Sequence, residues 1–385
     1  MSTLLVTLAL FLAWLLRERL LLDRARDRVP NRITVTGTRG KSGCARLLGA
    51  MLRAEGRRVV VKTTGSEATL VLPDGTTETI PRRGVPSIME QRDLIRRCAR
   101  LGADTLVAEI MSIHPENHRM EGLRILRPQT VLFTNARPDH VDAMGWDERA
   151  VCEVLLSSVP PGTHLLLPPS PPPLLEEHIR GGRWEAMKVA EGEATMPPAA
   201  GVFHDDLCLA AAAARRAGVG DRAVREGLED FREDAGGLRV WRLEPPGIRG
   251  PVYAVSAFAA NDPLSTVDVL DHVRGRLPSP LPCTGLLSLR ADRADRTLHW
   301  IRYLKEQGLS GVHPLFALGV QAGIASRRTP GIRALKWTGP GSVTREVCAA
   351  AGTDGPQILF GFGNFKGHGE ELAAWWAGEG SRVEL

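Results

Sequence analysis

Residues 36–42 read TGTRGKS and directly follow the β-branched run RITV. Glycines at such a place let backbone amides curl around phosphate oxygens, and the start of a following helix adds positive potential. A lysine there reaches the outer phosphates, and a serine hydroxyl can bind Mg²⁺. The usual eight-residue loop would have glycine where this chain has Val35, so the segment is a variant form. The residues predicted to bind a nucleotide triphosphate are Thr36, Gly37, Thr38, Arg39, Gly40, Lys41 and Ser42.

Polar side chains also follow two further apolar runs. Glu109 lies at the end of TLVAEI, Asn135 ends TVLFTN, and His140 lies five residues later. The carboxyl ends of parallel strands meet at one edge of a sheet, so we expect these side chains to converge on the loop. A carboxylate, an imidazole and a hydroxyl together would hold Mg²⁺ between a nucleotide and a second, anionic substrate. Ser42, Glu109 and His140 are therefore the predicted metal ligands, Lys41, Glu109 and His140 the predicted catalytic residues, and Asn135 a predicted nucleotide contact.

The elements that must position these residues alternate between two kinds. Short β-branched runs such as RITVT, RRVVVKTT and TVLFTN are separated by helical stretches, which predicts βαβ units and a mainly parallel sheet. A second series of strands and helices begins with PVYAVSAF after a turn-rich segment near residue 240. The prediction is an α/β protein with a P-loop ATPase domain over residues 29–240 and a smaller Rossmann-like domain over residues 241–385.

The N-terminus is expected to form a hydrophobic helix, with residues 1–28 as a membrane anchor and its basic flank. Residues 4–16 are apolar apart from Thr7, and several arginines follow them. The positive-inside rule would leave the body in the cytoplasm, on the inner face of the cell membrane. The run is shorter than the ~20 residues that a span needs, so an interfacial helix and a core helix stay open.

Composition narrows the classes of protein further. The 385 residues are 43% hydrophobic and 24% charged, which suits two folded domains. The net charge of +5 is dispersed, so an acidic substrate or lipid head groups fit better than nucleic acid, which we do not expect as a partner. Six widely spaced cysteines form no CxxC pair, which predicts a reduced, cytosolic body.

TGTRGKS, the run that ends near Glu109, and TNARPDHVD at 134–142 together resemble the central ATPase domain of the Mur ligase superfamily. Within that superfamily the chain looks most like the catalytic subunit of poly-γ-glutamate synthases. The loop begins almost at the N-terminus, which leaves no room for the nucleotide-sugar domain of the cell-wall members. The resemblance covers nearly the whole chain after residue 30.

The resemblance implies a ligase that uses ATP and Mg²⁺ to activate a glutamate γ-carboxylate as an acyl phosphate and couples it to the amine of glutamate. It also implies small membrane proteins of a polymer synthesis and export complex as partners. Residues 257–265 (AFAANDPLS) and 290–296 (RADRADR) look like motifs that close the site over ATP and glutamate. The candidates for ATP binding there are Asn261, Asp262, Arg290, Asp292 and Arg293. Residues 62–65 and 361–369 also fit the family.

One departure from the family pattern concerns a second metal. Many Mur ligases carry a carbamylated lysine soon after the Asp-His motif, and residues 152–158 of this chain contain no lysine. Two other functions stay open: a soluble folylpolyglutamate-synthase-like ligase, and a membrane-associated P-loop NTPase of another class. A GTPase should carry an NKxD motif, and none is found in a suitable place.

Overall fold

The computed structural model describes residues 2–65, 68–82, 84, 86–179, 184–190, 203–231, 236–277, 280–353 and 355–385. The chain forms two compact units. Unit 1 consists of Met1–Arg137 and Asp147–Arg232, and unit 2 of Pro138–Trp146 and Glu233–Leu385.

Unit 1 is built on an eight-stranded sheet in the order β4-β3-β2-β5-β1-β6-β7-β8. The strands are β1 (Asn31–Thr36), β2 (Val59–Thr63), β3 (Thr69–Val71), β4 (Thr77–Thr79), β5 (Thr105–Glu109), β6 (Thr130–Phe133), β7 (His164–Leu167) and β8 (Glu185–Lys188). The hairpin strands β3 and β4 pair antiparallel, β3 also pairs antiparallel with β2, and the other pairings are parallel. The α/β prediction is confirmed, with a mixed sheet in which parallel pairs predominate.

Alternating strand residues explain why helices cover both faces of this sheet. Val59 and Val61 of β2 pack with one helix layer, and Val60 packs with the other. The first layer contains α2 (Lys41–Ala54), α8 (His204–Arg216) and α9 (Asp221–Glu229). The second contains α3 (Met89–Arg100) and the π-helix η1 (Glu121–Leu126), which continues α4 (Pro115–Met120). The helices α6 (Glu148–Leu156) and α7 (Pro173–Ile179) complete the helices described for unit 1, apart from α1.

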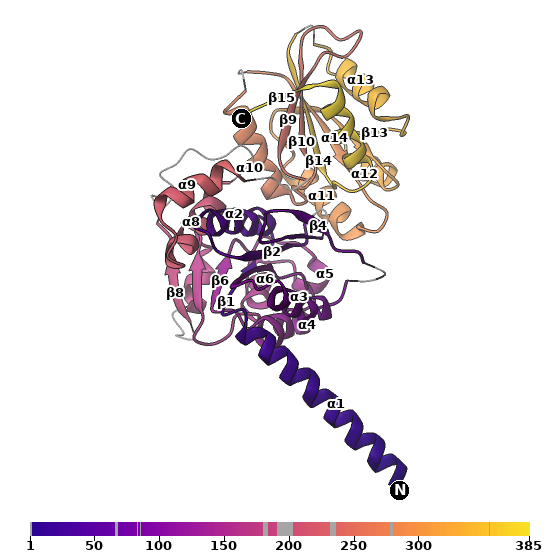
Figure 1. Ribbon diagram of the computed structural model, residues 1–385. Helices are drawn as coiled ribbons and strands as arrows, with labels where there is room; N and C mark the ends of the chain where they lie inside the picture. The colour runs from indigo at the N-terminus through magenta and orange to yellow at the C-terminus, as the bar shows by residue number, and fades with distance from the viewer. Residues whose placement is uncertain are drawn as a thin grey trace. The chain divides into compact units, whose positions relative to one another are not determined.

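Helix α1 (Ser2–Asp27) extends away from the rest of unit 1 (Figure 1). Its last turns pack on the body, where Ala25 is buried against α3 and η1 and Glu18 forms ion pairs with Arg92 and Arg96. Its outer half is exposed, with Leu4 at 73%. Charged residues from Arg17 onward interrupt the apolar run, and no helix in the described residues is long and apolar enough to cross a membrane. The prediction of a spanning helix is not supported.

Unit 2 contains a seven-stranded sheet in the order β13-β12-β11-β14-β10-β9-β15. Its strands are β9 (Arg239–Leu243), β10 (Val252–Ala257), β11 (Cys283–Ser288), β12 (Val312–Leu318), β13 (Ile332–Ala334), β14 (Gln357–Gly363) and β15 (Ser381–Val383). Strand β9 pairs antiparallel with β10 and with β15, and the remaining pairs are parallel.

Helices cover both faces of this second sheet as well. Residues of α10 (Pro263–Arg274), α11 (Ala294–Glu306) and α12 (Ala322–Arg328) pack on one face, and residues of α13 (Pro340–Ala350) and α14 (His368–Glu379) on the other. The short helix α5 (Val141–Met144) belongs to the segment that unit 2 takes from the middle of the chain.

Candidate functional site

The segment 36–42 forms the turn between β1 and α2, as its sequence predicts. Two glycines make the turn possible. Gly37 has φ +135°, and a β-carbon there would lie 2.0 Å from the Thr134 hydroxyl oxygen. Gly40 caps the start of α2 with φ +77°, and its β-carbon would lie 2.3 Å from a carboxylate oxygen of Asp206. Neither position has room for a side chain.

The end of β6 holds one side of this loop. The Asn135 side-chain oxygen accepts hydrogen bonds from the Thr38 hydroxyl (2.8 Å) and from the Arg39 amide (3.2 Å). The Asn135 side-chain nitrogen donates to the Arg39 carbonyl at 3.2 Å, and the Thr134 hydroxyl donates to the same carbonyl. In this structure the amide of Asn135 therefore fixes the loop backbone.

The end of β5 brings Glu109 to the other side of the loop. In the parallel pairing of β1 with β5, Glu109 lies opposite Val35. Its carboxylate accepts hydrogen bonds from the Ser42 hydroxyl at 2.8 Å and from the Thr64 amide at 2.7 Å. The Lys41 ammonium lies 4.0 Å from the same carboxylate and donates to the Gly37 carbonyl at 2.7 Å. Unit 1 thus brings together Lys41, Ser42 and Glu109.

The chemistry of these donors suits a hard divalent cation. A carboxylate and a hydroxyl are oxygen ligands of the kind that Mg²⁺ takes when nucleotide phosphates and water complete its coordination. Within the part of the chain that is described, no group of three or more His, Cys, Asp or Glu side chains is placed to hold a metal by itself. Ser42 and Glu109 therefore fit a cation that the nucleotide would help to bind.

The third predicted metal ligand, His140, belongs to unit 2. It has a left-handed backbone (φ 49°), and its Nδ1 lies 3.4 Å from a guanidinium nitrogen of Arg293. The neighbouring Asp139 carboxylate lies 3.9 Å from Arg293 and 3.5 Å from Arg296. Arg296 also donates to the Asn364 side chain at 3.2 Å, which connects this cluster to the loop after β14. The structure thus places the predicted metal ligands in two different units.

The other predicted contacts in unit 2 make local interactions. Asp262 is 2% exposed, and its carboxylate caps α10 by accepting from the Ser265 amide at 2.9 Å, with Asn261 directly before it. Arg290 forms a bidentate pair with Asp292, at 2.8 and 2.6 Å. The hydrogen bond from Arg290 lowers the pKa of Asp292. The ATP-binding roles predicted for these four residues stay predictions.

The segment 62–65 divides between two environments. The Thr64 amide faces Glu109, whereas the Lys62 side chain is fully buried and forms a 2.6 Å ion pair with Glu90 of α3. Burial lowers the pKa of Lys62, while the bond to Glu90 raises it. Lys62 therefore anchors α3 and does not reach the loop.

Sequence reasoning missed two polar residues next to the loop. Asp206, in the first turn of α8, is 8% exposed and lies against Gly40. Burial, with a smaller contribution from the Asp205 charge, raises the pKa of Asp206 to about 7. His118 of α4 is 2% exposed, and its Nε2 lies 3.3 Å from the Thr36 hydroxyl oxygen. Neither residue belongs to a sequence motif. Each is brought to the loop by long-range packing alone, so no local signal in the sequence could have identified it.

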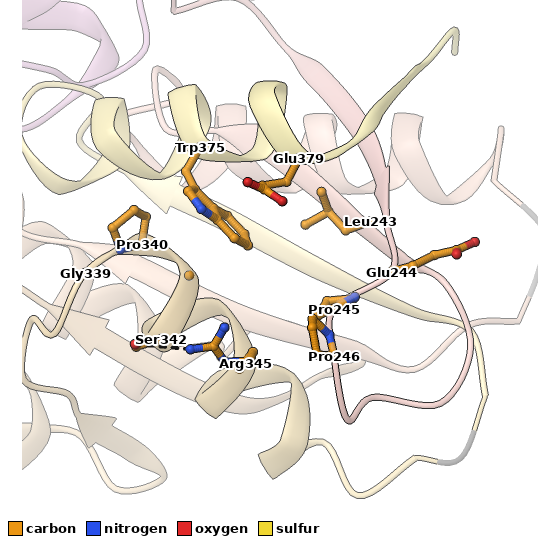
Figure 2. A pocket seen from close by; sticks show the side chains of 11 residues that line it. Leu243, Glu244, Pro245, Pro246, Gly339, Pro340, Ser342, Arg345, Trp375 and Glu379 are labelled. Atoms are coloured by element: carbon orange, nitrogen blue, oxygen red, sulfur yellow. Dashed lines mark hydrogen bonds between the residues drawn. The ribbon is translucent and has the colours of Figure 1, made fainter.

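Unit 2 also has a surface hollow of about 470 Å³ between the start of α13 and the end of α14 (Figure 2). It is lined by prolines and glycines together with the indole of Trp375, the guanidinium of Arg345 and the carboxylate of Glu379. No residue predicted from the sequence lines it. The predicted site residues are thus on other parts of the chain.

Two family models match this chain one after the other. The Mur ligase middle domain matches residues 35–151, and the poly-gamma-glutamate synthase CapB C-terminal domain matches residues 244–379. The first model spans the loop, Glu109 and Asn135. The second spans β10 to α14.

Relatives over longer stretches agree with these matches. The capsule biosynthesis protein CapB of Bacillus anthracis is 27% identical over 281 residues, which cover 71% of this chain and 60% of that protein. The chain thus spans less than two thirds of that relative. The PGA synthase CapB of Bacillus subtilis (strain 168) is 28% identical over 279 residues, which cover 70% of each chain.

Solved structures show the same fold at low identity. The folylpolyglutamate synthase/dihydrofolate synthase of Yersinia pestis, complexed with AMPPNP and a Mn ion, has a TM-score of 0.66 and 14% identity, covering 93% of this chain and 92% of that one. MurF from Acinetobacter baumannii has a TM-score of 0.65 and 14% identity, covering 94% and 80%. At such identities the likeness concerns the fold alone.

Proposed function

We propose that this chain, which belongs to the Mur ligase family and carries the C-terminal domain of its poly-gamma-glutamate synthase branch, is an ATP-dependent amide ligase that builds poly-γ-glutamate. The observation that carries the proposal is the match of residues 244–379, because the fold alone is shared with folate and cell-wall ligases. The substrates would be ATP, glutamate and the growing polymer, for a capsule or for release.

The reaction would take place in two steps. The γ-carboxylate of one glutamate attacks the γ-phosphorus of ATP, the bond to the β–γ bridging oxygen breaks, and an acyl phosphate and ADP form. The amine of a second glutamate then attacks the acyl carbon and loses a proton, and phosphate leaves as the amide forms. A carboxylate is already a competent nucleophile, so the protein mainly positions the reactants and stabilises charge.

The residues of unit 1 suit the first step. We assign the segment 36–42 as the phosphate-binding loop, whose amides at the start of α2 would hold the phosphates. Lys41, which donates to the Gly37 carbonyl in this structure, would turn to the outer phosphates. A divalent cation held by Ser42 and Glu109 would neutralise negative charge on the phosphates. The roles of His140 and of the predicted ATP contacts in unit 2 belong to the same proposal.

The test is ADP release by the purified protein with Mg²⁺-ATP, with and without L- or D-glutamate. Lys41→Ala removes the ammonium at the loop and serves as the inactive control. We expect release that depends on glutamate, disappears in Lys41→Ala, and accompanies γ-linked oligomers in the product. Release that ignores glutamate would contradict the assignment of the substrate.

A folate ligase is the second candidate, because folylpolyglutamate synthase structures share this fold over 93% of the chain. The same assay with a folate in place of the first glutamate separates the two. Folate-dependent ADP release, with one glutamate added to the folate, would favour this second function. The polymer assignment predicts no such stimulation.

We also propose that the outer half of α1 attaches the protein to the cytoplasmic face of the cell membrane, or to small membrane proteins of a polymer export complex. Leu4, Phe11 and Trp14 are among its apolar side chains, all at least half exposed. Exposed apolar area of this extent is unusual on a protein surface. We expect the full chain to co-float with anionic liposomes and a variant lacking residues 2–16 not to, and equal flotation of the two would refute the attachment to lipid.

A further inference from the structure

His118 is a buried imidazole to which the proposed chemistry gives no role. Its Nδ1 lies 2.7 Å from the carbonyl oxygen of Ser112, in the segment that follows β5. Its Nε2 lies 3.3 Å from the hydroxyl oxygen of Thr36, the last residue of β1 and the first of the loop. The ring therefore bridges the ends of the two strands that lead to Lys41 and Glu109.

The contacts determine where the ring carries its proton. A carbonyl oxygen only accepts hydrogen bonds, so Nδ1 must donate to Ser112. Burial is the main cause that lowers the pKa of His118, which favours the neutral ring. The Lys41 charge acts in the same direction, whereas the hydrogen bonds to the backbone of Ser112 and Leu155 and the Glu121 charge oppose it. A neutral ring with its proton on Nδ1 has a lone pair on Nε2, which can accept a hydrogen bond from the Thr36 hydroxyl.

Ser112 is itself fixed by a second buried group. The Glu121 carboxylate is fully buried and accepts from the amides of Met111 and Ser112, both at 2.9 Å, and from the Ser112 hydroxyl. The side chain of Gln91 donates to Glu121 and also to the Glu109 carbonyl, the latter at 3.2 Å. An unbroken path of hydrogen bonds thus leads from the backbone of Glu109 to the first residue of the loop.

We propose that His118 is a positioning residue that holds the start of the phosphate-binding loop in register with Glu109, acting through Thr36 and Ser112. The proposal rests on the proposed function only in that the loop binds a nucleotide. Thr134 and Asn135 hold the loop from β6, and His118 supplies a hydrogen bond to it from the α4 side. Burying a polar network carries a free-energy penalty of desolvation that apolar packing would avoid. What the network contributes here is a single, defined position of the loop.

The test measures nucleotide binding apart from folding. His118→Leu keeps the volume roughly and removes both hydrogen bonds, and Thr36→Val removes the hydroxyl while keeping the shape. Thr36→Ser restores the hydroxyl. His114→Leu, an exposed histidine four residues earlier, is the matched control. The dissociation constant for ATP is measured by calorimetry without glutamate, well below the melting temperature of each variant.

We expect His118→Leu and Thr36→Val each to weaken ATP binding about tenfold, the effect of one buried hydrogen bond. The double variant should bind no worse than the weaker single variant, because both changes break the same contact. Thr36→Ser should recover most of the binding that Thr36→Val loses, and His114→Leu should bind like the wild type. A purely structural histidine would lower the melting temperature and leave the dissociation constant unchanged.

Three results would overturn the proposal: unchanged binding in His118→Leu, additive losses in the double variant, or a wild-type chain that binds no ATP. If His118→Leu does not fold, the pair Thr36→Val and Thr36→Ser decides alone, and equal binding by the two would refute it. Wild-type ATP binding without glutamate ligation would defeat the proposed function and leave this inference standing. The two failures are therefore distinguishable.

Discussion

The hydroxyl of Ser42 donates a hydrogen bond to the carboxylate of Glu109 at 2.8 Å, although 67 residues separate the two in the chain. Parallel pairing of β1 with β5 brings them to the same edge of the sheet, and the Thr64 amide gives the carboxylate a second donor. Two predicted cation ligands are thus already in contact, with Glu109 only 4% exposed. A cation that binds both would replace this hydrogen bond without moving either strand.

This contact gives a first prediction, for Glu109→Gln. The amide keeps the shape of the side chain but removes the negative charge that would hold the cation. We expect kcat for glutamate-dependent ADP release to fall by about 10²-fold or more and the Mg²⁺ concentration for half-maximal rate to rise. Glu116→Gln, an exposed change on α4, should leave both quantities unchanged. A Mg²⁺ titration of the rate checks this, and an unaltered titration would remove Glu109 from the site.

The raised pKa of the buried Asp206 carboxyl leads to a second prediction, an unusual dependence of stability on pH. Its pKa is about 7 in the fold, raised mainly by burial, against an ordinary value of 3.8. Between these two values the unfolded chain has lost a proton that the folded chain keeps, so the stability contributed by this group falls as pH rises from about 4 to about 7. Below that window the penalty is absent, and above it the penalty is constant at roughly 4 kcal/mol.

Asp206→Asn should therefore flatten this slope and stabilise unit 1 above pH 7. Chemical denaturation of both proteins between pH 5 and pH 8 measures the difference. Asp93→Asn, an exposed change on α3, is the control and should run parallel to the wild type. Parallel curves for Asp206→Asn as well would mean that the carboxylate is not the source of the slope.

The short-range features of the site could be predicted from sequence, and the long-range ones could not. The segment 36–42 contains its own signal, because glycines, lysine and serine follow a strand directly, and Glu109 is marked by its place at a strand end. The expected strands at RITVT, TLVAEI and PVYAVSAF are confirmed as β1, β5 and β10. Apolar runs rich in β-branched side chains determine such strands locally.

His118, Glu121 and Asp206 could not be found in this way. Each is an ordinary polar residue on a helix, and its role depends on which strand end the helix crosses. The antiparallel edges also escaped prediction, because the short strands β3, β4 and β15 have three residues each. In three residues the alternation of apolar and polar side chains is too short to identify a strand, so its antiparallel pairing could not be predicted either.

A partly buried arginine of α11 leads to a prediction about unit 2. Arg296 pairs with Asp139, which is 7% exposed, and donates to Asn364. The Asp139 carboxylate lies near two arginines, and Arg296→Met removes the nearer one while Arg293 remains. We therefore expect a loss of about 3 kcal/mol in the free energy of unfolding. Arg302→Met, on the same helix, removes an exposed pair with Glu306 and should cost less than about 0.5 kcal/mol. Urea denaturation compares the two, and equal losses would contradict the buried pair.

The last prediction concerns Gly122, the second residue of η1. A β-carbon there would lie 1.9 Å from the carbonyl oxygen of Ser158, so the helix and that carbonyl must separate in Gly122→Ala. We expect a cost of about 1–3 kcal/mol in stability. The same shift would move Glu121, and through Ser112 and His118 it would weaken ATP binding as well.

Gly43→Ala provides the matched comparison within unit 1. Gly43 is helical, and a β-carbon there would meet no atom within 4 Å apart from its chain neighbours and the backbone of its own helix. Its replacement by alanine should therefore stabilise α2 by up to about 1 kcal/mol. Thermal unfolding of the two variants beside the wild type measures both changes, and calorimetry measures ATP binding. If Gly122→Ala unfolds like the wild type, the close packing of η1 on Ser158 is wrong. If it is less stable but binds ATP normally, η1 supports the fold without positioning the loop.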